Sequence, residues 1–165
     1  MTVFQRLAIA IAPVLLFAPP SLAQAQPQDG NNLALDSIVE LVKTETDANG
    51  TVTTRYAKPD VVVPGDRVRI TLRFHNRSRD AIQNLKLRNP IPDGLKFDGT
   101  DDLEGFTVSV DGGSNWGQLA TLMVTPAGGA LRPATAADVT HVMWILPQPV
   151  TPGSRGAVSF FTRVQ

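Results

Sequence analysis

The chain has 165 residues with 15 basic and 15 acidic side chains, a balance that argues against nucleic acid as its main partner. Its hydrophobic content of 42% is ordinary for a globular protein and excludes general disorder or a bundle of membrane helices. The absence of cysteine excludes disulfides, thiol catalysis and thiolate metal sites. A chain of this length is expected to form one domain.

The first 25 residues have the pattern of a secretory signal peptide. Arg6 precedes the apolar run Leu7–Phe17, which is too short to cross a bilayer as a helix. Small residues then allow cleavage after Ala23 or Ala25. Loss of Arg6 leaves 14 basic against 15 acidic residues, a net charge of −1. We therefore expect a periplasmic or extracellular protein with no membrane span in the mature chain.

A polar, flexible leader is predicted over residues 26–32, followed by a single β-domain over residues 33–165. Thirteen glycines and thirteen prolines lie mostly between apolar runs, as the turns of an all-β protein do. No window shows helical periodicity with caps, and residues 127–138 are expected to hold one helical turn at most. Strands are predicted at Leu33–Lys43, Thr51–Ala57, Asp60–Val63, Arg67–His75, Ile82–Asn89, Leu95–Phe97, Phe106–Val110, Leu119–Val124, Val139–Leu146 and Gly156–Val164.

The clearest of these segments is Arg67–His75, in which apolar residues alternate with basic or polar ones. Such alternation is typical of a strand with one buried face. Short strands spaced by turns favour an immunoglobulin-like antiparallel β-sandwich over a parallel α/β sheet. The last strand, Gly156–Val164, is expected to pair inside the fold, because an unpaired apolar strand promotes aggregation. The predicted core consists of Val68, Ile70, Leu72, Phe74, Leu85, Leu87, Val142, Trp144, Val158 and Phe160.

Five motifs follow one another along residues 33–164. They are Leu41-Val42-Lys43-Thr44, Val63-Pro64-Gly65-Asp66 with the strand ending at Asn76, Leu85 to Leu95 with its Asn-Pro-Ile-Pro-Asp-Gly turn, Val108 to Gly113, and Trp144-Ile145-Leu146 with Pro152-Gly153. In this order the chain resembles the bacterial surface-repeat family catalogued as domain of unknown function eleven, an immunoglobulin-like conserved repeat domain. Asn89 departs from the aspartate usual in that family. The resemblance implies a sandwich used for structure or contact, with no catalytic residues to carry over.

Residues Ser109 to Trp116 fit the Ser-x-Asp-x-Gly-x-x-Trp pattern of Asp-box hairpins, which recur in sialidase propellers. Asp111 is expected to accept backbone N–H groups across the turn, with Trp116 packed beneath it. The pattern occurs once here, so a structural hairpin is preferred to a glycan site.

Arg67, Arg69 and Arg73 share one strand face and form a candidate anion or partner contact, since guanidinium groups bind phosphate and carboxylate bidentately. A solvated sheet face is the preferred alternative. A basic patch that continues from these arginines to Lys86 would be split in two if the Lys86 strand lies in the opposite sheet.

The acidic segment Asp98 to Glu104 has the oxygen ligands of a calcium site but lacks the EF-hand spacing. It is therefore interpreted as a solvated loop, and no metal site is predicted.

Only two histidines, His75 and His141, are available for acid–base chemistry, and neither accompanies a nucleophile motif. We therefore predict no enzymatic activity, no catalytic residue and no cofactor.

The favoured function is an exported structural or protein-interaction module of the bacterial cell envelope or surface, with an envelope protein as partner. The alternative is a carbohydrate-binding or glycan-processing surface protein, indicated by the Asp-box and the arginines. A strand donor or acceptor is a third possibility, because sheet edges can accept an added strand.

Overall fold

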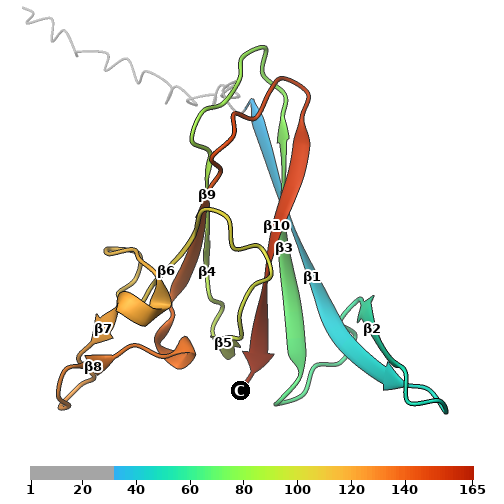
Figure 1. Cartoon of the computed structure of the whole chain (residues 1–165), viewed down its shortest axis with the longest axis vertical. Coiled ribbons are helices and arrows are strands. Elements are labelled where there is room, and N and C mark those ends of the chain that lie inside the picture. Colours follow the sequence, from blue (N-terminus) through green and yellow to red (C-terminus); the bar gives the residue numbers. More distant parts are fainter. Residues whose placement is uncertain (1–31) are drawn as a thin grey trace, which may run out of the picture.

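A computed structural model describes residues 32–165, which fold into two antiparallel sheets that face one another (Figure 1). The predicted signal peptide and nearly all of the predicted leader lie outside the described residues. The elements are β1 (Leu33–Thr46), β2 (Val52–Ala57), β3 (Arg67–Asn76), β4 (Lys86–Pro90), β5 (Leu95–Phe97), β6 (Phe106–Ser109), the 3₁₀ helix η1 (Leu119–Thr121), β7 (Met123–Val124), β8 (Arg132–Pro133), the 3₁₀ helix η2 (Ala136–Asp138), β9 (His141–Ile145) and β10 (Arg155–Val164).

The large sheet has the strand order β2-β1-β3-β10-β5, and the small sheet has the order β4-β9-β6. All strand pairs are antiparallel, including the separate two-stranded ribbon of β7 and β8. Figure 1 shows the two sheets close together at one end and splayed apart at the other, where β1 and β2 extend to one side and β7 and β8 to the other. The all-β prediction is confirmed, and the described residues contain no α-helix.

Three predicted strands differ from the structure. Asp60–Val63 forms no strand, because the Val63 N–H donates to the Asp66 carboxylate in a turn and no strand among the described residues pairs with the segment. Within Ile82–Asn89 the strand begins only at Lys86, because Asn84 has a positive φ of 49° that interrupts extended backbone. Leu119–Val124 begins as η1 and only its last two residues form β7. The single helical turn allowed within residues 127–138 is η2.

The core lies between the sheets and contains the ten residues that the alternation predicts. Trp144 of β9 is fully buried at its centre, with ring centroids 4.9 Å from Phe106 and 6.2 Å from Phe160. Leu72 and Phe74 are only partly buried but pack against this core. The prediction of one shared core is confirmed.

The last strand, β10, is paired on both sides within the large sheet, as predicted. It pairs with β3 over most of its length and with β5 near its end. Beyond β5, the segment of residues 98–104 follows the same edge, where the Phe161 N–H donates to the Gly99 carbonyl and the Ser159 N–H donates to the Asp102 carboxylate. The Asp102 carbonyl also accepts a 2.7 Å hydrogen bond from Trp144 Nε1. The segment therefore closes the β10 edge and ties it to the core.

Candidate functional site

The three arginines that the sequence predicts as a contact lie on the outer face of the large sheet, away from the core. Arg67 Nε donates to the Asp98 carboxylate at 2.8 Å, and Arg73 Nη2 donates to the Asp36 carboxylate at 2.6 Å. Arg69 forms no ion pair with any described residue. The basic residues of β4 belong to the other sheet. The arginines share one face as predicted, but two of them are neutralised, so they form no continuous anion-binding stripe.

Arg69 instead borders a hollow of about 210 Å³ on this outer face. Its guanidinium lies 4.6 Å from the centroid of the Tyr56 ring. The Arg69 side chain therefore extends from β3 across β1 to β2. Thr71, two residues along the strand, is only 8% exposed. Neither the Thr71 hydroxyl nor Arg69 Nε has a hydrogen-bond partner. We call this the outer hollow; its polar lining is Tyr56, Arg69, Thr71, Asp101, Asp102 and Ser159.

The acidic segment from Asp98 to Glu104 serves structural contacts. Asp98 accepts from Arg163 at 3.1 Å as well as from Arg67, and one Asp102 oxygen accepts both the N–H and the hydroxyl of Ser159. Within residues 32–165 no three histidine or carboxylate side chains are grouped to hold a metal ion. Asp98 and Asp102 thus hold the segment against β3 and β10.

The Asp-box residues form a hairpin turn. One Asp111 oxygen accepts the N–H groups of Ser114 and Asn115 and the hydroxyl of Ser109, while the indole Nε1 of Trp116 donates to the Gly113 carbonyl at 2.8 Å. The Asn115 N–H, then the Ser109 hydroxyl and the Asn115 side chain, lower the pKa of Asp111 from 3.8 to about 2. These hydrogen bonds occupy the carboxylate, which agrees with the preference for a structural hairpin over a glycan site.

The two histidines belong to different sheets, His75 to β3 and His141 to β9. Desolvation, followed by the charges of Arg155 and Arg77, lowers the pKa of His75. His141 Nδ1 lies 3.1 Å from the Thr140 hydroxyl, which itself donates to a backbone carbonyl.

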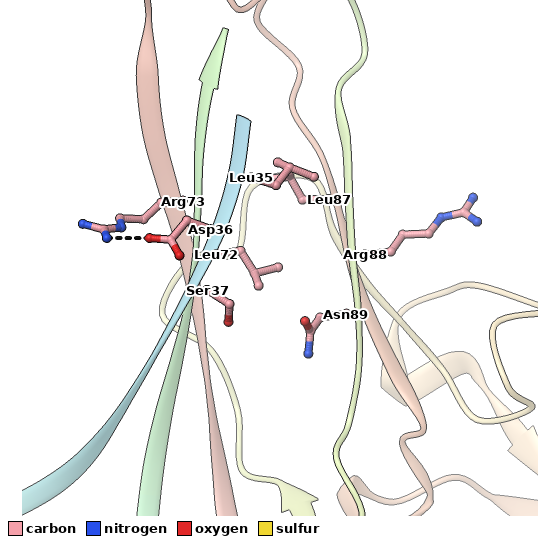
Figure 2. A pocket seen from close by; sticks show the side chains of 8 residues that line it. All are labelled: Leu35, Asp36, Ser37, Leu72, Arg73, Leu87, Arg88 and Asn89. Carbon is pink, nitrogen blue, oxygen red and sulfur yellow. Dashed lines mark hydrogen bonds and ion pairs between the residues drawn. The ribbon is translucent and has the colours of Figure 1, made fainter. Parts of the chain in front are cut away.

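A second hollow, of about 250 Å³, opens between the sheets along β1 and β4. Figure 2 shows Leu35 and Leu72 from the large sheet facing Leu87 of the small sheet across it, while Asp36 and Arg73 form their ion pair on the other face. We call it the open groove; the side chains that face into it are Leu35, Ser37, Leu72, Leu87 and Asn89.

The open groove exists because both strands along it are sheet edges. From Leu33 to Glu40, β1 pairs only with β3, since its pairing with β2 starts at Leu41, and β4 pairs only with β9. Leu35 lies opposite Phe74 in the register, so it is on the core-facing side of the sheet, yet it is 61% exposed. Val39, on the same side, is 45% exposed. The sandwich is thus incompletely covered on this side.

Sequence reasoning placed Arg69 correctly but missed both hollows. The sequence predicts a strand that includes Leu35 and Val39. Ile38 and Val42 place apolar side chains on the opposite face, so the alternation in β1 does not identify the inward side. The only signal for Thr71 was its place between two arginines on the outward side of β3.

Comparisons with protein-family models, with curated proteins and with solved structures give no match. The resemblance to the surface-repeat family therefore stays a prediction that depends on the five sequence motifs. None of the helices within residues 32–165 has the length and apolar character needed to cross a membrane.

Proposed function

We propose that this chain is an exported, non-catalytic interaction module of the bacterial cell envelope or surface that binds a protein partner. The signal-like residues 1–25 support export, and the resemblance to the surface-repeat family supports a surface role. The two facing antiparallel sheets support an immunoglobulin-like sandwich as the finer fold class. N-terminal sequencing of the exported protein should find Gln24 or Gln26 first, whereas an intact Met1 in a cytosolic fraction would contradict export.

The open groove is the observation that carries this proposal. Its two edges have strand backbone that is hydrogen-bonded on one side only, and its floor exposes leucine side chains on the core-facing side of the large sheet. Unpaired N–H and C=O groups along a strand edge bind an extended polypeptide, and the side chains beneath select apolar residues at alternate positions. The partner is therefore an extended protein segment with alternating apolar side chains.

Affinity capture from the native envelope with matched variants tests the proposal. Leu35→Asp places a charge in the groove and should abolish capture, with little change in folding because the side chain is already 61% exposed. Val61→Asp is the control, since Val61 is 74% exposed but lies outside the groove. The partner retained by the native protein and by the control is then purified and its binding to each form measured.

Loss of binding in Leu35→Asp alone supports the proposal. Equal binding by both variants, or equal loss from both, would contradict it.

A further inference from the structure

The large sheet ends at β2, which pairs with β1 and, among the described residues, with no other strand. Figure 1 shows β2 at the margin of the molecule, and its side chains from Val52 to Tyr56 are all exposed. Natural proteins usually block such an edge with a lysine, a proline or a bulge, because a free strand edge binds other strands. The strand Val52–Ala57 contains neither lysine nor proline, and its register with β1 is regular. The β2 edge is therefore open to a further strand.

The hydrogen bonds of the β1–β2 hairpin determine which backbone groups of β2 are free. Where the hairpin turns, the Asp47 N–H donates to the Thr51 carbonyl at 3.0 Å. Hydrogen-bonded and non-hydrogen-bonded pairs alternate along an antiparallel ladder, and Val52 belongs to the next pair. Val52, Thr54 and Tyr56 are therefore in non-hydrogen-bonded pairs with β1. Their N–H and C=O groups point away from β1, toward the free edge.

A second copy of β2 fits this edge when it runs antiparallel and the two strands are centred on Thr54. Only residues with outward N–H and C=O groups can form hydrogen-bonded pairs across the new ladder. With Thr54 opposite Thr54 of the second copy, Val52 lies opposite Tyr56 in both directions, so every opposed pair of this set is of the hydrogen-bonded kind. A shift by one residue would instead oppose backbone groups that point away from each other. The edge is thus complementary to itself, as a two-fold dimer requires.

The side chains along the edge fit the same arrangement. Pairs of β-branched and aromatic residues across strands stabilise a sheet, and here Val52 would meet the Tyr56 ring, which already packs against the Arg69 guanidinium at 4.6 Å. On the other face, Arg55 would lie opposite Thr53. Arg55 Nε lies 3.5 Å from the Glu45 carboxylate, so its charge has a partner within its own hairpin. The centred register therefore places no like charges directly opposite each other.

We infer that the chain forms a symmetric dimer through β2, in which the two large sheets join into one continuous antiparallel sheet. The inference is independent of the proposed protein partner, because the open groove lies along Leu33–Glu40 of β1 and the pairing with β2 starts only at Leu41. The interface consists of one short strand from each copy, and small interfaces are weak, so the Kd should be on the order of 100 µM.

Disulfide trapping of the exported protein tests the register directly, since the chain has no cysteine of its own. Opposed residues of a hydrogen-bonded pair have Cα atoms about 5.5 Å apart, within the range of a disulfide. Thr54→Cys should therefore form disulfide dimers under mild oxidation. Thr53→Cys is the matched control: it is equally exposed, but the two copies of residue 53 would be diagonal neighbours roughly 7–8 Å apart, too far to bridge readily. The disulfide should form about tenfold faster in Thr54→Cys, because pairing raises the effective concentration of its thiols.

Sedimentation equilibrium measures the dimer without a crosslink. Thr54→Pro removes an N–H that β1 does not use, so it should keep the fold and weaken dimerisation at least about tenfold. Thr54→Val retains the N–H and should dimerise like the native protein. Leu35→Asp, which alters only the open groove, should also remain dimeric.

Faster disulfide formation in Thr54→Cys than in Thr53→Cys, together with a native dimer that Thr54→Pro weakens, supports the inference. Equal disulfide rates in the two cysteine variants, a native protein that stays monomeric up to about 1 mM, or a dimer that Thr54→Pro leaves unchanged would overturn it.

Discussion

Trp144 offers the most quantitative test of the fold. Its side chain is 0% exposed, packs between Phe106 and Phe160, and donates from Nε1 to the Asp102 carbonyl at 2.7 Å. Trp144→Ala removes the ring and leaves a cavity, which costs about 3–5 kcal/mol of unfolding free energy. Trp144→Phe keeps an aromatic ring but removes the donor to Asp102, so its cost should be smaller, about 1–3 kcal/mol.

Equilibrium unfolding in urea, followed by fluorescence and circular dichroism, measures both costs. At an m value of about 1.5 kcal/mol/M, a loss of about 4 kcal/mol lowers the unfolding midpoint by roughly 2–3 M. Trp116→Ala is the control, since this tryptophan is only partly buried and donates to a carbonyl of its own hairpin; it should cost no more than about 1–2 kcal/mol. A loss below about 1 kcal/mol for Trp144→Ala, or equal losses at both tryptophans, would refute this description of the core.

Three further predictions follow from the turns and the last strand. Gly105→Ala should cost several kcal/mol in urea unfolding, because a Cβ there would collide with the backbone carbonyl of Ile145, whereas Gly112→Ala, also at positive φ but in open space, should cost about 1 kcal/mol. Because the folded-state pKa of Asp111 is lowered to about 2, the stability that it provides is complete above its ordinary pKa of 3.8 and is lost as pH falls through about 2. The stability difference between the native protein and Asp111→Asn should therefore be largest at about pH 6 and shrink in acid, and a difference that does not change with pH would contradict this. Deletion of Phe160–Gln165 should give an insoluble or protease-sensitive product, since the segment pairs with both β3 and β5; a soluble product with unchanged melting would show that the strand is dispensable.

The sequence predicts those parts of the fold in which one strand face is buried and the other is solvated. In β3 the alternating apolar side chains face the core, where Val68 and Ile70 are buried and Leu72 and Phe74 partly buried. In β10 Val158 and Phe160 are buried on that same side, although Ser159 and Phe161 on the other side are buried as well. The apolar pattern predicts a strand wrongly where β-branched residues have no neighbouring strand, as at Val61, which is 74% exposed. The pattern also places the start of a strand too early at Asn84, where a single residue with positive φ interrupts the extended backbone before β4.

The candidate sites depend on contacts between residues that are far apart in the sequence. The neutralisation of Arg67 and Arg73 requires carboxylates 31 and 37 residues away in the chain, so neither pairing can be read from β3 itself. The outer hollow brings together Thr71 of β3, Tyr56 of β2 and Asp102 after β5, which are well separated along the chain. The open groove results from the placement of two strands at the edges of different sheets, which alternation within a strand cannot predict.

Photo-crosslinking in intact cells tests the central claim, that the open groove binds an extended protein segment. A photoreactive residue is placed at Leu35 or Val39 on the groove side of β1, and at Val61 or Leu131 as exposed controls outside it. We predict that both groove positions capture the same partner chain, with crosslinks confined to one continuous segment in which apolar residues alternate. Capture from the control positions alone, or crosslinks scattered over the partner surface, would contradict the claim.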